Sequence, residues 1–158
     1  MNENSKLKNK FIFNWVLTNK LAIGTSPMNN KDLILLKKNK VKNILCLCSE
    51  KESKWHSELE NNFLCYRFIL PDSNQKKLPT KIQIDKAYEI LKKLVRNNIT
   101  FVHCFASVER SPLLCIMFIM DKYNLNLEES LDYVKRVHYL TNPRNNQLFT
   151  IEKYFSNT

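Results

Sequence analysis

The feature that most constrains the fold is an unbroken apolar run late in the chain. Residues 110–123 read RSPLLCIMFIMDKY, and every residue from Leu113 to Met120 is apolar. A helix that is apolar on all its faces must be surrounded by other elements, because no side of it can be left in water. The segment 99–104, ITFVHC, precedes it and has the composition of a short strand. We therefore predict a helix at the centre of one core, with a strand leading into it.

The remaining chain alternates apolar runs of strand length with amphipathic runs of helix length, which is typical of an α/β domain. The pattern predicts a single domain with a central, mostly parallel sheet of about four or five strands, flanked by helices on both faces. Residues 1–12 are expected to form a polar tail and residues 13–158 the domain. Strands are expected at 13–17, 20–24, 41–48, 63–70 and 99–104, and helices at 31–39, 78–98, 110–123, 126–140 and 145–155. Residues 50–62 are expected to hold a short helix or loop.

Two helix starts carry capping signals. Thr80 precedes the long helical pattern, and Asn126 is followed three positions later by Glu129, as in a capping box.

The charge of the chain invites a nucleic-acid interpretation, which the distribution of that charge does not favour. The formal net charge is +10, with 25 lysine and arginine residues. These residues are spread over every segment, and no RNA-recognition, zinc-finger or helix-turn-helix pattern accompanies them. We expect no nucleic-acid partner, although the excess positive charge favours anionic substrates. No apolar run approaches the roughly 18 residues of a membrane span, so membrane insertion is not expected either.

The cysteine usage indicates a reduced, cytoplasmic protein. The five cysteines are an odd number and lie mostly in apolar runs: Cys46, Cys48, Cys65, Cys104 and Cys115. Cys46 and Cys48 share one face of an expected strand and could begin a metal site. Because no second such pair or cluster of histidines completes four ligands, no metal and no cofactor are predicted. Whether Cys46, Cys48 or Cys115 can form a disulfide with Cys104 is left open, as is the oligomeric state.

The turn before the apolar helix has the composition of a chemical site. It places Cys104, five further residues and then Arg110 between a strand and a helix, and it contains no glycine, since the only glycine of the chain is Gly24. A helix N-terminus directs backbone N–H groups and the positive end of the helix dipole toward an anion, and the same field stabilises a thiolate. The planar guanidinium of Arg110 can hold two phosphate oxygens. The turn therefore predicts a nucleophile aimed into a phosphate cradle.

The stretch HCFASVERS resembles the phosphate-binding signature of the cysteine-dependent protein tyrosine phosphatase superfamily. Three other segments resemble its dual-specificity branch: KLAIGTSP with VKNILCLCSE, FILPDS before a long helix, and the tail. The likeness covers roughly residues 13–155. It implies a dual-specificity phosphatase-like catalytic domain that hydrolyses phosphotyrosine, phosphoserine, phosphothreonine or a small phosphorylated substrate through a cysteinyl-phosphate, without a cofactor.

The resemblance also implies roles for individual residues. Cys104 is the expected nucleophile, Ser111 the hydroxyl that assists release of the thiolate, and Asp72 the general acid, with Asp85 as the runner-up. His103 is a supporting residue that orients the loop. The expected phosphate loop consists of Phe105, Ala106, Ser107, Val108, Glu109 and Arg110.

Several positions around the loop leave alternatives open. Glu109 either braces Arg110 or disfavours polyphosphorylated inositol lipids, and Phe105 either lines the rim or packs below the loop. Arg144, Lys76 and Lys77 are expected to be solvated charges, and His56 and His138 to be surface or partly packed residues.

Ser107 stands where the family usually has glycine, so a positive φ there would strain the backbone. This position keeps a second interpretation open, a pseudophosphatase that binds phosphate or a phosphoprotein without turnover. A rhodanese-type fold is a third, because the cell-cycle phosphatases of that fold carry serine at the same place.

Overall fold

The computed structural model describes residues 10–156 and is built around a five-stranded sheet of order β1-β2-β5-β3-β4. Only the β1–β2 pair is antiparallel, and the other neighbours run parallel. The strands are β1 (Phe13–Leu17), β2 (Leu21–Gly24), β3 (Asn43–Cys46), β4 (Leu64–Arg67) and β5 (Thr100–His103). This arrangement confirms the predicted single α/β domain with a mostly parallel sheet.

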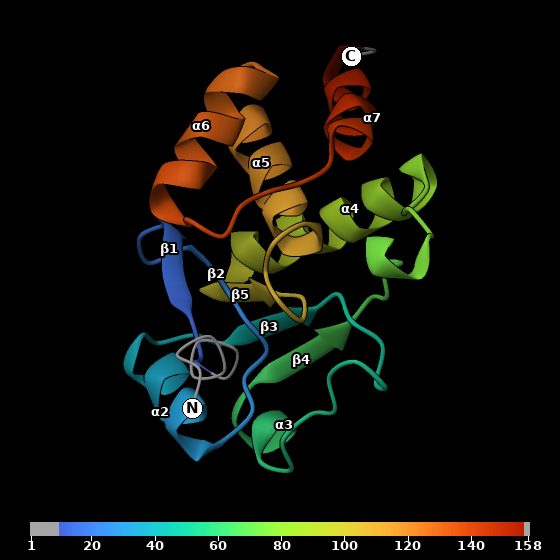
Figure 1. Cartoon of the computed structure of the whole chain (residues 1–158). Coiled ribbons are helices and arrows are strands. Elements are labelled where there is room, and N and C mark those ends of the chain that lie inside the picture. Colours follow the sequence, from blue (N-terminus) through green and yellow to red (C-terminus); the bar gives the residue numbers. More distant parts are fainter. Residues whose placement is uncertain (1–9, 157–158) are drawn as a thin grey trace, which may run out of the picture.

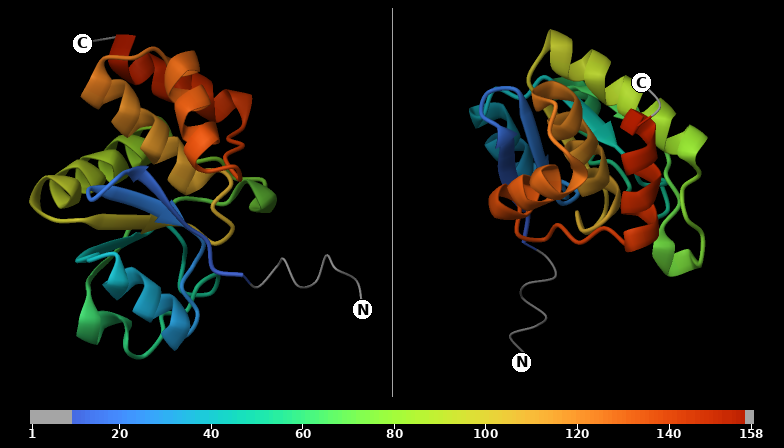
Figure 2. Two further views of the ribbon diagram at one scale, coloured as in Figure 1. Left: turned by 90° about the vertical axis from the view of Figure 1, so that its left-hand side faces the viewer. Right: turned by 90° about the horizontal axis from the view of Figure 1, so that it is seen from above.

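The helices form two layers on opposite faces of the sheet (Figure 1 and Figure 2). One layer holds α4 (Lys81–Asn97), α5 (Arg110–Tyr123), α6 (Leu127–Val137) and α7 (Asn145–Ser156), and the other holds α2 (Asn30–Lys38) and the short α3 (Leu59–Asn62). The last helix and the long α4 lie side by side, and Tyr154 of α7 meets Tyr88 of α4 edge to face.

The apolar helix α5 lies at the centre of the helical layer, as the sequence predicts. Every residue from Arg110 to Met120 is buried, and the helix packs against α4, α6, α7 and the strands β2 and β5. Because β5 is the middle strand and runs directly into α5, the connection between them is placed at the carboxyl edge of the sheet. Ligand sites of open α/β sheets form at this edge.

The helix starts differ in a way that matters for that edge. Both predicted caps are present: the Thr80 side chain accepts from the backbone of Gln83, and Asn126 forms a reciprocal capping box with Glu129. By contrast, the side chain of Glu109, the N-cap residue of α5, makes no capping hydrogen bond. The first N–H groups of α5 are thus left available to a ligand.

The single glycine of the chain, Gly24, lies where two backbone segments pass close together, and not in the expected phosphate loop. Gly24 ends β2, and a Cβ at this position would overlap the carbonyl oxygen of Ile12. Its φ is not positive. The residues in the described part of the chain that do take a positive φ include Ser107, in the connection between β5 and α5.

Candidate active site

The connection between β5 and α5 curls around the N-terminus of the central helix and carries Cys104 at its base. The Cys104 side chain is only 3% exposed. Its Sγ lies 3.3 Å from the Oγ of Ser111, which is in the first turn of α5. The sulfur therefore sits at the positive end of a helix, beside one hydroxyl group.

The backbone of residues 104–110 turns its carbonyl groups toward the surrounding protein. The Phe105 oxygen accepts from Ser26 N at 3.3 Å and the Val108 oxygen from Asn142 N at 2.8 Å. The Ser107 oxygen lies 2.9 Å from His138 Nε2. Within residues 10–156, the N–H groups of residues 105–110 donate to no protein acceptor. The loop is thus anchored through its acceptors while its donors remain free for an anion.

The Ser107 backbone has a φ of 57°, the left-handed conformation that strains a residue other than glycine. Its side chain is fully buried and lies within hydrogen-bonding distance of two partners, the Ser111 Oγ at 3.2 Å and the His138 Nε2 at 3.0 Å. His138 is itself fully buried. The expectation that His138 is a surface or partly packed residue is therefore wrong, because the segment after α6 folds back over the loop.

Arg110 is held by a carboxylate that the sequence analysis missed. Its guanidinium, 5% exposed, makes a two-point contact with Glu52, with Nη2–Oε1 at 2.8 Å and Nη1–Oε2 at 3.3 Å. Nη1 also donates to the Leu70 carbonyl at 3.2 Å. Glu52 follows strand β3 at the same carboxyl edge as the loop, and this placement is the signal that could have found it.

The Arg110–Glu52 pair changes the ionisation of both groups. Burial works to raise the pKa of Glu52, but hydrogen bonds from Arg110 and from the backbone of Ser49 outweigh it and hold that pKa below its ordinary value. Burial likewise works to lower the pKa of Arg110, and the bond to Glu52 together with nearby thiols raises it above normal. Both side chains are therefore charged at neutral pH.

Asp72 reaches the same site from another loop. Its Oδ1 accepts from Asn74 N at 3.0 Å and caps the short 3-10 helix η1 (Ser73–Gln75). Its Oδ2 lies 3.7 Å from Arg110 Nη2, and the side chain is 25% exposed. The runner-up, Asp85, lies within α4 and pairs with Lys81 at 2.7 Å. Of the two candidates for the general acid, only Asp72 contacts Arg110.

Glu109 does not brace Arg110, so that interpretation is wrong. Its carboxylate accepts from Arg144 Nε at 3.3 Å and from Gln147 Nε2 at 3.4 Å, both near the start of α7. These contacts tie the loop to α7, and the predicted solvated charge Arg144 is exposed but paired. Phe105 is 52% exposed, which places its ring on the surface and not below the loop.

His103 and two cysteines form a buried cluster behind the loop. His103 Nδ1 lies 3.2 Å from the Cys104 carbonyl oxygen, while its buried Nε2 has no hydrogen-bond partner within the described residues. Nε2 and the sulfurs of Cys46 and Cys48 all lie within 4.8 Å of one another. The sequence did not indicate this neighbour of the two cysteines, and the three side chains offer one ligand atom fewer than the four considered for a metal site.

The cluster is nevertheless a poor cradle for a cation. The cationic Arg67 already places Nη1 3.4 Å from Cys46 Sγ. A soft metal ion such as Zn²⁺ would have to displace that guanidinium and find a fourth ligand. The interaction between the two side chains lowers the pKa of Cys46 and raises that of Cys48.

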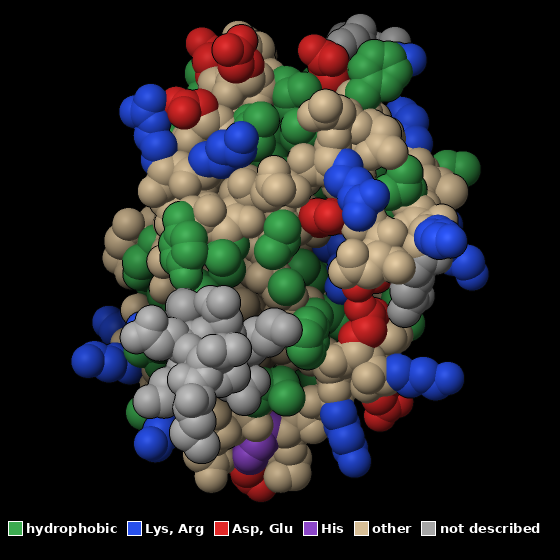
Figure 3. Space-filling model, in the orientation of Figure 1, with side chains coloured by type: hydrophobic (Ala, Val, Ile, Leu, Met, Phe, Trp, Pro, Cys, Tyr) green, Lys and Arg blue, Asp and Glu red, His purple; other side chains and the backbone are tan. Residues whose placement is uncertain are grey.

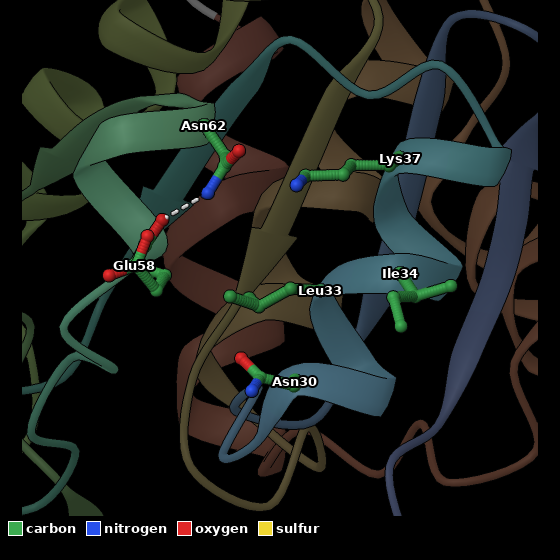
Figure 4. Close-up of a pocket in the computed structure, with 6 residues that line it drawn as sticks. All are labelled: Asn30, Leu33, Ile34, Lys37, Glu58 and Asn62. Carbon is green, nitrogen blue, oxygen red and sulfur yellow. Dashed lines mark hydrogen bonds between the residues drawn. The ribbon is translucent and has the colours of Figure 1, made fainter.

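Other surface features lie away from the loop. A groove between α2 and α3 is lined by Leu33, Ile34, Lys37, Glu58 and other residues of those two helices, none of which belongs to residues 104–110 (Figure 4). Lysine and arginine side chains are scattered over the visible face and form no continuous stripe (Figure 3). No helix of residues 10–156 is long and apolar enough to cross a membrane.

A family model described as "Dual specificity phosphatase, catalytic domain" matches residues 25–157. The chain belongs to this family. It is 23% identical over 133 residues to a probable dual specificity protein phosphatase of Dictyostelium discoideum, a match that covers 84% of this chain and 32% of that protein. The chain thus spans about a third of the length of this relative.

Solved structures of dual specificity phosphatase relatives share the fold. A human tyrosine phosphatase-like serine/threonine/tyrosine-interacting protein superposes with a TM-score of 0.78 at 18% identity, covering 92% of this chain and 96% of that one. PTPMT1 in complex with PI(5)P superposes with a TM-score of 0.77 at 16% identity, covering 92% and 95%. The predicted resemblance to the dual-specificity branch is confirmed, and the rhodanese-type alternative is wrong.

Proposed function

We propose that this chain is a cysteine-dependent phosphomonoesterase that hydrolyses phosphorylated protein side chains, or a related small phosphate ester, through a cysteinyl-phosphate. The observation that carries the proposal is which backbone groups of the loop have hydrogen-bond partners in the protein. Its carbonyl groups are bound by the surrounding protein, and its N–H groups from Phe105 to Arg110 have no protein acceptor within residues 10–156. Backbone donors that are free of protein acceptors, in a loop that begins at a buried cysteine, suit a phosphoryl group with three charged oxygens.

The first step of the proposed reaction transfers the phosphoryl group to sulfur. The Cys104 thiolate attacks phosphorus, and the bond between phosphorus and the ester oxygen breaks. Asp72 gives its proton to that oxygen, because an alkoxide or phenoxide leaves poorly without one. Arg110 holds two of the phosphoryl oxygens throughout, and its contact with Glu52 fixes the plane of the guanidinium beforehand.

The second step returns the enzyme to its starting state. A water molecule attacks the cysteinyl-phosphate, Asp72 now accepts its proton, and the bond between phosphorus and sulfur breaks. Ser111, whose Oγ is 3.3 Å from Cys104 Sγ, donates to the departing thiolate. The products are inorganic phosphate and the free alcohol or phenol.

The substrate class follows from the exposed surroundings of the loop. Half-exposed Phe105 offers an aromatic surface to a peptide or phenyl group beside the cradle. Glu109 places a carboxylate in the loop, but its contacts with Arg144 and Gln147 offset part of that charge. We therefore favour phosphorylated protein side chains, with the cytoplasmic location expected from the cysteine usage as part of this proposal.

Hydrolysis of p-nitrophenyl phosphate by the wild type and by Cys104→Ser tests the proposal, with and without a chelator. We expect turnover by the wild type, no change on chelation and a loss of at least about 10³-fold in the variant. Turnover that survives the Cys104 change, or that requires added metal, would contradict the mechanism. Trapping of radiolabelled phosphate on Cys104 after an acid quench gives an independent readout.

The second candidate function is binding of phosphate or a phosphoprotein without turnover. It is favoured by the positive φ of Ser107, a conformation that costs a non-glycine residue on the order of 1 kcal/mol. A folded wild type that binds tungstate but releases no p-nitrophenol would select this alternative.

A further inference from the structure

A line of polar contacts joins the first strand of the sheet to the candidate nucleophile. Asn14 of β1 meets His138 Nδ1 at 2.8 Å, and His138 Nε2 meets Ser107 Oγ at 3.0 Å. Ser107 Oγ meets Ser111 Oγ at 3.2 Å, and Ser111 Oγ meets Cys104 Sγ at 3.3 Å. His103 and Arg110 touch the loop elsewhere, so this line is a separate support for it.

The direction of the hydrogen bonds follows from the groups themselves. The Ser107 carbonyl oxygen, 2.9 Å from His138 Nε2, can only accept, so Nε2 carries a hydrogen. Nε2 therefore donates to the Ser107 carbonyl and Oγ, which leaves the Ser107 hydroxyl hydrogen for Ser111. Ser111 in turn donates to the sulfur. Each donor along the line points toward Cys104.

The other side of the ring completes the assignment. Burial lowers the pKa of His138, so the ring is neutral at pH 7 and its Nδ1 accepts. The structure places Asn14 Oδ1 2.8 Å from Nδ1, and because Nδ1 accepts, we assign the amide the orientation turned by a half-turn, in which its NH₂ group donates to Nδ1. Strand β1 thereby fixes the ring plane and the tautomer of His138.

We propose that His138 is a positioning residue of the active site, which holds Ser107 in its left-handed conformation and starts the donor line that ends on the Cys104 sulfur. The proposal deepens the proposed function and rests on Cys104 as the nucleophile. A glycine would take the conformation of Ser107 without strain. In this chain the buried contact between the Ser107 side chain and His138 offsets the strain, and it adds a polarised hydroxyl behind Ser111.

The test is a double-mutant cycle between His138 and Ser107, measured with p-nitrophenyl phosphate. We expect His138→Ala to lower kcat by about tenfold, the effect of losing one buried hydrogen bond. His138→Gln keeps an N–H donor and is expected to restore most of kcat. In a Ser107→Gly background, which removes both the strain and the hydroxyl, His138→Ala is expected to cost less than about threefold.

A second readout reports on the sulfur without turnover. The pH midpoint of Cys104 alkylation by iodoacetamide is expected to rise by about 0.2–0.6 units in His138→Ala and in Ser107→Ala, because each loses polarisation of the donor line. His56, which is partly exposed and whose ring Nδ1 accepts from the nearby Glu58 N at 3.2 Å, provides the matched control His56→Ala. Its midpoint is expected to match the wild type.

The outcomes separate this inference from the proposed function. Equal costs of His138→Ala in both backgrounds, with unchanged alkylation midpoints, overturn the positioning role even if the wild type is active. If the wild type shows no turnover but the alkylation midpoints of His138→Ala and Ser107→Ala still rise, the proposed function is overturned and the donor line is supported. If His138→Ala does not fold, His138→Gln and Ser107→Ala are compared instead. Equal pH midpoints of Cys104 alkylation in these two variants would again overturn the positioning role of His138.

Discussion

The two loops that meet at Arg110, residues 104–110 and 71–79, differ in whether distant or neighbouring residues hold them in place. Residues 104–110 are held by groups from distant parts of the chain, among them Ser26, Glu52, His138 and Asn142. In residues 71–79, the backbone bonds are local, Asn74 N to Asp72 Oδ1 at 3.0 Å and Lys76 N to Ser73 O at 3.0 Å. Across the site, Asp72 Oδ2 lies 3.7 Å from Arg110 Nη2.

This difference matches the tasks proposed for the two loops. Donors that stabilise developing charge act best when they are fixed before the reaction begins, because no energy is then spent on arranging them. A general acid instead has to approach the leaving group of a bound substrate, and a loop with local bonds can make that movement. Substitutions in the first loop should therefore disturb binding and chemistry together, and those in the second loop chemistry alone.

The largest expected effect is that of Arg110→Lys. Lysine cannot reproduce the two-point contact with phosphate or with Glu52, so kcat/KM should fall by about 10³-fold and the affinity for inorganic phosphate should fall with it. Steady-state kinetics and phosphate titration measure the two losses. Arg136→Lys, at an exposed pair with Asp132, is the matched control. A loss below about tenfold would contradict the assigned role of Arg110.

Asp72→Asn should lower kcat by about 10²-fold for phenyl phosphate, while phosphate affinity changes little. The loss should be smaller for p-nitrophenyl phosphate, because its leaving group needs less protonation. Comparing kcat for the two esters measures this difference. Asp85→Asn, in α4, serves as the control. Equal losses with both esters would remove Asp72 from the role of acid.

Glu52→Gln should act on the anchored loop through Arg110. The variant keeps the shape of the side chain but leaves a buried guanidinium without its counter-charge, which should cost about 1–3 kcal/mol in the free energy of unfolding. We expect kcat/KM to fall by about tenfold as well. Urea denaturation and kinetics measure both, with exposed Glu50→Gln as the neighbouring control. An unchanged unfolding free energy would show that the ion pair does not hold the loop.

The smallest expected effect is a stepwise loss of stability in acid. The pKa of His138 is lowered in the fold by burial, so the unfolded chain takes up a proton first and stability falls as pH drops below the ordinary value of 6.5. The pKa of Glu52 is also lowered, so its contribution is fully present above its ordinary 4.5 and is lost as pH falls through the folded value. Urea midpoints across this range should lose the first step in His138→Gln and the second in Glu52→Gln. Retention of both steps in both variants would refute the assignment.

Much of this architecture could be predicted from local patterns. The all-apolar run predicts the buried centre, and Thr80 and Asn126 predict their caps. The strand before Cys104 and the apolar helix after Arg110 indicate the candidate site. Each of these signals depends on residues that are near neighbours in the chain. The predicted strands 41–48 and 63–70 were longer than β3 and β4, since an apolar composition continues past the last regular pairing.

Contacts between distant segments could not be predicted in this way. Glu52 and Arg110 are 58 positions apart, and Ser107 and His138 are 31 positions apart. Glu52 lay in a polar stretch without a motif, and His138 in a segment expected near the surface. Nothing in the local composition of either segment indicates which loop it will cover.

The sequence by itself determined the class of the fold and indicated which groups of one turn are the candidates for the chemistry, because periodicity and the residues of a single turn are local properties. Only the tertiary structure decided how that turn tolerates Ser107. A positive φ is costly for serine alone, and partners brought in from β1 and the segment after α6 surround it with buried hydrogen bonds. The chemistry proposed for the loop therefore depends on residues 104–111, and the shape of the loop on the residues that pack around them.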